Sequence, residues 1–361
     1  MDEIFCIRFL NSHRNRKSKT CTEPFDSAQD KLHRSIQNRK WVGVLAILVS
    51  LVGCVAMAHA QQAKVYRVGV LLPGGPLYEA IDGLRAGLKE LRLEEGKQFT
   101  LTIRDTKGDV KAAEEAAGGF EREKFNLIYT LATSVVTAAK GATANIPIVF
   151  GVGSDPVTGE LVESFAKPGG RLTGVHYLVR DLTAKRLEIL KEVLPKLSRV
   201  VTFYNPGNRV ATDSAKLGRE EAKRLGLKFI ERHANSVEEL KKALQALKIG
   251  EADAYFYTPD AMVTGQAQLI IDTAKAKKLA TMFHEQSLVA RGALASYGQN
   301  YHAVGRASAK YVQRVLHGAH PRDLRIETIE NIELAINLQT AKQLGLTVPP
   351  ELLMRADKVI K

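Results

Sequence analysis

Apolar residues recur in two alternating patterns from residue 65 onward. Short apolar runs bounded by Gly, Pro, Asn or Asp indicate buried strands, whereas apolar positions three and four residues apart indicate helices. The short runs predict strands at 66–72, 99–103, 127–130, 146–150, 172–177, 199–204, 228–232, 254–257, 280–283, 293–297 and 333–338. Strands that alternate with helices favour an α/β fold of parallel sheets with helices on both faces.

Helical periodicity falls between these strands. It predicts helices at 77–93, 109–122, 134–143, 157–165, 209–225, 237–247, 261–278 and 303–317. A further helix is expected after Asp181, which would be its N-cap, with an end at Pro195.

The strand–helix pattern restarts at residue 199, which gives two sets of about 110–120 residues each. No Ser- or Pro-rich linker separates the sets, and strand-like crossings are expected near 177–181 and 298–301. Two such sets without a flexible tether predict two Rossmann-like lobes with a hinge and a cleft between them.

The strand that begins at Ile146 leads directly into Gly153, Ser154 and Asp155. Ligands of open α/β sheets bind at the carboxyl ends of the strands, because loops and helix N-termini gather there. We therefore expect Asp155 at the rim of a ligand cleft, where its task is to hold a ligand.

Small or polar residues follow other strands of both sets as well. Together the strand ends supply a candidate ligand-binding set: Pro73, Gly74, Thr133, Ser134, Gly153, Ser154, Asp155, Tyr204, Asn205, Asp260 and Tyr297. Such a set suits a zwitterionic small molecule. Asp155 and Asp260 would flank its ammonium group, and a helix N-terminus at Thr133 and Ser134 would receive its carboxylate. The two tyrosines would stack on an apolar side chain.

These residues also have structural alternatives. Asp155 and Asp260 precede helical segments and could serve as N-caps, and Tyr204 and Tyr297 could be half-buried sheet residues. The Gly-Val-Gly at 151–153 matches part of a dinucleotide fingerprint, but the third glycine of that motif is missing. Nucleotide binding is therefore not expected.

Composition and charge exclude several classes of function. The 361 residues carry a net charge of +13, of which +9 is spread over the chain beyond residue 60. No basic run is interleaved with aromatic residues, so a nucleic-acid partner is not expected. All three cysteines precede residue 55, which leaves a later mature domain without an internal disulfide or thiol chemistry.

The first 60 residues read as a leader with a signal peptide. A basic pair at 39–40 precedes an apolar run at 41–52, and Ala58-His59-Ala60 is typical of a cleavage site. The sequence before Cys54 also resembles a lipobox. The protein is thus expected to be exported to the bacterial periplasm or the extracytoplasmic membrane surface, either soluble after cleavage near Ala60 or lipid-anchored at Cys54. Residues 1–38 read as an over-long start or a disordered leader.

Signals for catalysis are weak. The histidines are scattered without HExxH spacing, and neither a GxSxG motif nor a cysteine nucleophile is present beyond the leader. We therefore predict a binding protein rather than an enzyme, with no metal and no cofactor, and keep an enzyme only as the third and weaker alternative.

Several short motifs occur together over about residues 65–361. They are Arg67-Val-Gly-Val-Leu-Leu-Pro73, Glu95-Gly96, Ile146-Pro-Ile-Val-Phe150, Gly153-Ser-Asp-Pro156, Lys167-Pro-Gly-Gly170, Leu172-Thr-Gly174, Lys185-Arg-Leu-Glu-Ile-Leu-Lys191, Tyr204-Asn-Pro206, Ser296-Tyr-Gly298, Ile336-Asn-Leu338 and Leu344-Gly-Leu-Thr-Val-Pro-Pro350. This combination resembles the bacterial ABC-transporter substrate-binding proteins of the tryptophan/tyrosine-type (TrpX-like) family.

The resemblance implies a periplasmic-binding-protein type I fold in which the chain crosses between the lobes three times. Residues 65–178 plus about 300–320 would form the first lobe, and 179–299 plus about 321–361 the second.

The resemblance also implies an ABC importer component that captures a small molecule, expected to be an aromatic amino acid or a related compound. It would be a monomer that delivers this ligand to a membrane permease with a separate ATPase. The alternative function is an extracytoplasmic sensing module that presents a ligand to a signalling partner.

Overall fold

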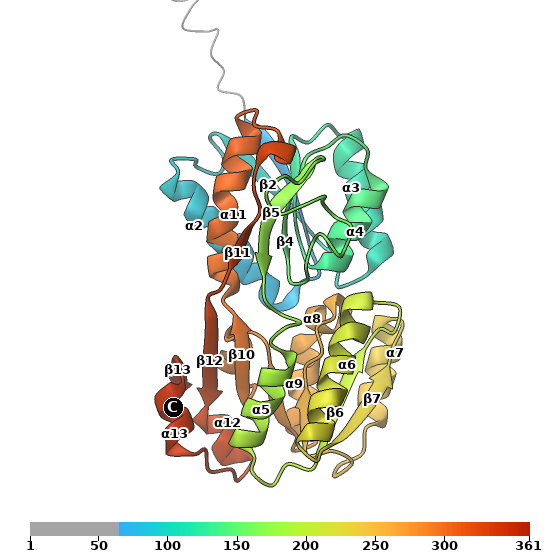
Figure 1. Cartoon of the computed structure of the whole chain (residues 1–361), viewed down its shortest axis with the longest axis vertical. Coiled ribbons are helices and arrows are strands. Elements are labelled where there is room, and N and C mark those ends of the chain that lie inside the picture. The colour runs from blue at the N-terminus through green and yellow to red at the C-terminus, as the bar shows by residue number, and fades with distance from the viewer. Residues whose placement is uncertain (1–64) are drawn as a thin grey trace, which may run out of the picture. The chain divides into compact units, whose positions relative to one another are not determined.

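The computed structural model describes residues 65–361, and this part of the chain builds two sheets (Figure 1). The first sheet is parallel throughout, in the order β2-β1-β3-β4-β5-β11. Its strands are β1 (Tyr66–Leu72), β2 (Phe99–Asp105), β3 (Leu127–Leu131), β4 (Ile148–Val152), β5 (Leu172–Tyr177) and β11 (Glu327–Ile329). We call this sheet and the helices that pack on it the first lobe.

The second sheet has the order β7-β6-β8-β9-β10-β12-β13, and only β12 runs antiparallel to a neighbour, β10. Its strands are β6 (Arg199–Tyr204), β7 (Lys228–His233), β8 (Ala254–Phe256), β9 (Ala280–Phe283), β10 (Ala295–Gln299), β12 (Ile332–Asn337) and β13 (Lys358–Ile360). This sheet and its helices are the second lobe. The predicted α/β fold with two sheets is therefore confirmed, and its only departure from parallel pairing within residues 65–361 is the β10–β12 pair.

Helices cover both faces of the first sheet: α2 and α11 lie on one face, and α3 and α4 on the other (Figure 1). They are α2 (Tyr78–Glu90), preceded by the 3₁₀ turn η1 (Gly75–Leu77), α3 (Val110–Arg122), α4 (Thr133–Ala142) and α11 (Tyr301–Leu316). Glycines permit α2 and α11 to approach closely, since a Cβ at Gly83 would lie 1.9 Å from the His302 carbonyl oxygen.

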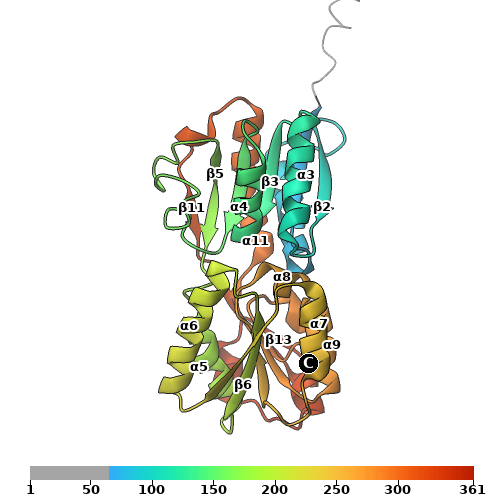
Figure 2. The same ribbon diagram turned by 90° about the vertical axis from the view of Figure 1, so that its right-hand side faces the viewer.

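In the second lobe, α5 and α6 cover one face of the sheet, and α7 and α9 the other (Figure 2). Its helices are α5 (Thr183–Val193), α6 (Arg209–Arg224), α7 (Val237–Ala246), α8 (Ala261–Gly265), α9 (Ala267–Ala276), α10 (Ser287–Ala290), α12 (Leu338–Gln343) and α13 (Pro350–Arg355). A further 3₁₀ turn, η2 (Pro321–Asp323), precedes β11.

The chain passes between the two sheets three times. It leaves the first sheet after Tyr177, returns between Gln299 and Tyr301, and leaves again between Ile329 and Ile332. The first two passages lie where the sequence pattern placed them. The third comes later than the expected boundary near 320, because β11 pairs with β5 at the edge of the first sheet.

Three predicted helices differ from the structure. Residues 157–165 form turns, because the Asp155 carboxylate accepts the Val157 N–H (2.7 Å) and Glu160 has a φ of 56°. Asp181 is not an N-cap: α5 begins at Thr183 after Leu182, and no side chain caps it. The helix expected at 261–278 is divided into α8 and α9 at Gln266.

Apolar side chains fill both faces of each sheet, as parallel sheets require. Phe150 lies in a cluster under α3 and α4, and Val200 in a cluster on the α5 side of the second sheet. A third cluster runs from Val68 of β1 through Tyr177 and Tyr301 to Val201 of β6. The two lobes therefore share one continuous core where the chain passes between them.

The residues from Val65 onward all fall in one compact unit. None of its helices is long and apolar enough to cross a membrane. The expected leader of residues 1–60, with the cleavage site near Ala60 and the lipidation site at Cys54, lies outside the described residues.

Candidate functional site

A cavity lies at the carboxyl ends of the strands of both sheets, where the sequence placed the ligand site. The first lobe and its crossings line it with Ala132, Thr133, Ser134, Gly153, Tyr177 and Tyr301. The second lobe lines it with Asn208, Val210, Tyr257, Pro259, Asp260 and Thr264. The space among these residues measures about 430 Å³, including the part that is open to solvent. We call it the inner cavity.

The N-terminus of α4 forms the first-lobe wall of the inner cavity. Ala132 precedes the helix with a φ of 71° and provides no side-chain cap, so the first N–H groups of α4 receive no cap from it. A non-glycine residue in this conformation is uncommon and occurs preferentially at functional sites. Thr133 Oγ1 lies 2.8 Å from Ser154 Oγ, which fixes both hydroxyls. A helix N-terminus of this kind favours an anionic group.

Asp260 provides a carboxylate from the second lobe. It is the N-cap of α8, since its Oδ1 accepts the Val263 N–H at 3.1 Å. Its Oδ2 accepts from the Asn205 N–H (3.2 Å) and from Asn208 Nδ2 (3.1 Å). Burial raises the pKa of the Asp260 carboxyl, and the hydrogen bonds from Val263 and Asn205 oppose that rise. A carboxylate has about four acceptor positions, so Asp260 can cap α8 and still accept from a ligand.

Asp155 lies beside a second, more open cavity. This outer cavity shares Thr133, Ser134 and Asn208 with the inner cavity and is also lined by Ser154 and Asp155. Asp155 Oδ1 accepts the N–H groups of the two residues that begin the following turn, at 2.7 and 3.3 Å. Asp155 is therefore placed at the outer rim of the site, where it also organises its own loop.

Pro73 and Gly74 follow β1 but do not line the inner cavity. A Cβ on Gly74 would lie 2.8 Å from the Asp105 carboxylate, and one on Gly265 of α8 would lie 2.3 Å from the Pro73 carbonyl oxygen. This loop of the first lobe thus packs against α8. Asn205 lies on the far side of α8, beside a third cavity, and reaches the site only through its hydrogen bond to Asp260.

The two tyrosines expected to stack on a ligand are not brought to the inner cavity. Tyr204 donates a hydrogen bond from its hydroxyl to Glu231 (2.6 Å), and the same oxygen lies 2.9 Å from His233 Nε2. Tyr297 pairs with Leu334 across β10 and β12 and packs in the cluster on the α5 side of the sheet. Successive side chains of a strand point to opposite faces, which turns both residues away from the cleft.

Three other tyrosines, Tyr177, Tyr257 and Tyr301, form the aromatic wall of the inner cavity. The rings of Tyr177 and Tyr301 meet edge to face with centroids 5.6 Å apart. The Tyr257 hydroxyl lies 2.8 Å from Thr264 Oγ1, and its ring stacks on His284 at 3.9 Å. The sequence contains a signal for all three. Tyr177 and Tyr301 lie at the ends of the two predicted crossings, and Tyr257 lies at the end of the strand that precedes Asp260.

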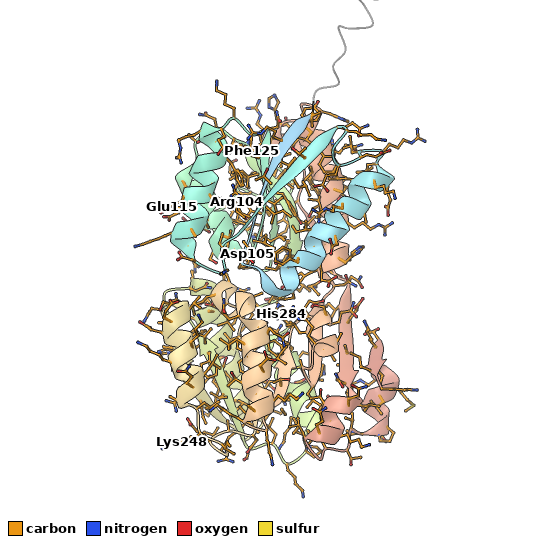
Figure 3. The ribbon with its side chains drawn as sticks, turned by 180° about the vertical axis from the view of Figure 1, so that it is seen from behind. Arg104, Asp105, Glu115, Phe125, Lys248 and His284 are labelled. Carbon is orange, nitrogen blue, oxygen red and sulfur yellow. The ribbon has the colours of Figure 1, made fainter. Side chains whose placement is uncertain are left out.

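Taken together, the inner cavity offers an aromatic wall, a helix N-terminus and a carboxylate. Figure 3 labels Asp105 and His284, which mark the ends of the two sheets that face this region. Such a set holds a small molecule that carries opposite charges and an apolar part. Among residues 65–361, no cluster of His, Cys, Asp and Glu has the composition of a metal site.

Known proteins share this architecture. A crystal structure of a conserved domain protein from Vibrio cholerae is 30% identical, with a TM-score of 0.74, and covers 82% of this chain and 100% of its own. An ABC domain from Streptococcus pneumoniae in complex with L-Trp is 22% identical, with a TM-score of 0.73 and the same coverage of both chains. These likenesses show the type I periplasmic-binding-protein fold.

The sequence comparisons agree with the fold. The tyrosine-binding protein of Clostridioides difficile strain R20291 is 26% identical over 291 residues, which cover 80% of this chain and 82% of that protein. The family model for ABC transporter substrate binding proteins matches residues 66–360. That family consists of solute-binding proteins, which confirms the prediction of a binding protein rather than an enzyme. The chain therefore belongs to the family of ABC transporter substrate binding proteins.

Proposed function

We propose that this protein is the extracytoplasmic component of an ABC importer that captures an aromatic amino acid and delivers it to a membrane permease. The observation that carries the proposal is the inner cavity, which both lobes line with an aromatic wall, a helix N-terminus and a carboxylate. The names of the relatives support the ligand class, since one binds tyrosine and another was crystallised with L-Trp.

Each part of the cavity has a matching part of the ligand. The α-carboxylate faces the N-terminus of α4 at Thr133 and Ser134, and the ammonium group faces Asp260. The ring lies against the tyrosine wall, where aromatic contacts stabilise it beyond the burial of apolar area. Asp155 acts at the outer rim as the second carboxylate.

Ligand binding favours the closed arrangement of the lobes. The ligand touches residues of both lobes, so its affinity for the closed form exceeds its affinity for an open form. The closed protein, a monomer, then docks on the permease, which a separate ATPase drives.

The role of the carboxylates is tested by calorimetry with L-tyrosine, L-tryptophan and L-leucine on the purified protein. Asp260→Ala should weaken binding of the aromatic amino acids about tenfold to a hundredfold, because a hydrogen bond to a charged group is lost. Asp155→Ala should have a smaller effect, because Asp155 lines only the outer cavity. Asp272→Ala, an exposed aspartate of the same lobe, is the matched control. Undiminished affinity in both Asp155→Ala and Asp260→Ala would refute this role.

Transport is tested in cells that lack the gene. Uptake of labelled tyrosine or tryptophan at submicromolar concentration should fall and should be restored by the wild-type gene but not by Asp260→Ala. Unchanged uptake, together with a ligand-dependent change in gene expression, would instead support the sensing function.

Export is proposed on the sequence of the leader. The processed chain begins either after Ala60 or at a lipid-modified Cys54, and the intact mass of the protein from soluble and membrane fractions distinguishes the two forms.

A further inference from the structure

Arg186 of α5 is a fully buried cation directly behind the wall of the inner cavity. Its side chain has no exposed surface. One terminal nitrogen, Nη2, donates to the Val179 carbonyl oxygen (2.8 Å) and to Thr183 Oγ1 (3.1 Å). The guanidinium carbon lies 5.7 Å from the centre of the Tyr257 ring. Val179 and Tyr257 both line the inner cavity, so only that wall separates the charge from the cavity.

Among residues 65–361, the charge of Arg186 has no carboxylate partner. Its Nε and Nη1 have no hydrogen-bond acceptor, and no carboxylate of residues 65–361 forms an ion pair with it. Burial lowers the pKa of the guanidinium to about 10, and the nearby Tyr257, Tyr301 and Tyr255 oppose that effect. Arg186 therefore remains positive at neutral pH. A buried, uncompensated charge is costly and is retained where an anion compensates it.

Other polar groups beside Arg186 are unpaired as well. Both ring nitrogens of His284 and the hydroxyl of Tyr255 are buried without a partner. Burial, and then the charge of Arg186, lower the pKa of His284 well below its ordinary value, so this histidine is neutral. His284 stacks on Tyr257 and lies at the end of the second sheet that faces the first lobe (Figure 3). These unpaired polar groups thus gather behind one wall of the inner cavity.

We propose that Arg186 supplies the fixed positive charge that selects ligands with a carboxylate in the inner cavity. The proposal rests on the proposed function and adds the requirement for an anionic group. In a poorly hydrated interior, a unit charge acts across a ring or a peptide group with little screening, so direct contact with the ligand is not required. Arg186 and the N-terminus of α4 then attract the same carboxylate from the two lobes.

A purely structural role explains only part of the geometry. Nη2 alone makes both hydrogen bonds of this side chain, one to the crossing at Val179 and one to Thr183 of α5. Nε and Nη1 add nothing to that support. A structural arginine would change stability when replaced, but it would leave the preference between ligands with and without a carboxylate unchanged.

The test is calorimetry with three compounds that share one ring: L-tyrosine, tyramine without the carboxylate, and 3-(4-hydroxyphenyl)propionate without the ammonium group. Wild-type protein should bind tyramine about a hundredfold more weakly than tyrosine, since a charge-assisted interaction of this size is lost. Because the charge is buried, this ratio should change by less than about twofold between low and 0.5 M salt.

Arg186→Met should bring the affinities for tyrosine and tyramine to within about threefold of each other, because the fixed charge is lost. Arg186→Lys should keep the preference. Arg291→Met, at an exposed arginine of the same lobe, is the control.

Thermal unfolding would show whether Arg186→Met folds. If it does not, the ligand series on the wild type and on Arg186→Lys still tests whether Arg186 selects ligands with a carboxylate. Equal wild-type affinity for tyrosine and tyramine would overturn the role of Arg186 but would leave the proposed function standing. A folded Arg186→Met protein that retained the preference would also overturn it. Binding of none of the three compounds would instead refute the proposed ligand class on which the inference rests.

Discussion

At the scale of single residues, the inner cavity is built from side chains that follow strands of both sheets. Thr133, Ser134, Gly153 and Asp260 all line the inner cavity. Their positions follow from one rule, that parallel strands end at a common edge. Asp260 caps α8 and also lines the inner cavity, so its structural role as an N-cap is compatible with a role in ligand binding.

The aromatic residues of the site required information that the strand pattern does not contain. Tyr204 ends its strand as expected, but its side chain lies on the face of the sheet where its hydroxyl contacts Glu231 and His233. The sequence pattern does not show which face of this strand points to the cleft, because nearly all of its positions are buried. The sequence pattern does not indicate Arg186 as a site residue, because a charged residue in a helix normally lies on a solvated face.

Glu285 gives a prediction for the pH dependence of stability. Its side chain is 2% exposed and accepts hydrogen bonds from the N–H and hydroxyl of Ser287. Burial, with a contribution from Glu79, raises the pKa of the Glu285 carboxyl to about 7. Because the folded pKa lies above the unfolded one, the contribution of this group to stability is complete below about pH 4 and is lost as the pH rises through 7.

Urea unfolding at pH 5 and pH 8 measures this effect. The free energy of unfolding of Glu285→Gln relative to wild type should rise by about 2.5 kcal/mol between these pH values, since one pKa unit corresponds to about 1.4 kcal/mol and part of the effect falls outside this range. Glu115→Gln, at an exposed glutamate of α3, should show no such rise. Parallel pH profiles for Glu285→Gln and wild type would contradict the prediction.

At the scale of elements, α8 is where the two lobes touch beside the cavity. A Cβ on Gly75 would lie 2.3 Å from the Thr264 carbonyl oxygen, and one on Gly108 would lie 2.2 Å from Met262 Cα. Gly265 of α8 faces the Pro73 carbonyl oxygen in the same way. The sequence pattern predicted a continuous helix through this region. The break at Gln266 follows because the backbone at Gly265 packs against a loop of the other lobe.

Gly265→Ala tests this contact. Unlike Gly75 and Gly108, Gly265 has no positive φ, so alanine adds bulk without local backbone strain. The added methyl should hold the lobes apart and weaken ligand binding about fivefold to a hundredfold, the range that overpacking by 1–3 kcal/mol implies.

Calorimetry with the same aromatic ligand provides the measurement for this variant. Gly170→Ala, where a Cβ would meet no atom within 4 Å, is the matched control. Wild-type affinity in Gly265→Ala would show that the lobes do not need this contact to hold a ligand.

At the scale of the whole molecule, the two-lobed α/β architecture follows from the repeated strand–helix pattern. The first two passages between the sheets were predicted because a strand ends at each. The third was misplaced because β11 has three residues at the edge of a sheet, too few to produce a clear pattern. The shared core around Tyr177 and Tyr301 ties these passages to the cavity. Closure of the lobes and formation of the ligand site are therefore expected to be one event.

The central claim is that the inner cavity selects an aromatic amino acid. Native mass spectrometry of the protein after incubation with an equimolar mixture of the common amino acids tests it most directly. The account predicts a single adduct per chain with the mass of tyrosine, tryptophan or phenylalanine. An adduct with an aliphatic or acidic amino acid, or no adduct at all, would contradict it.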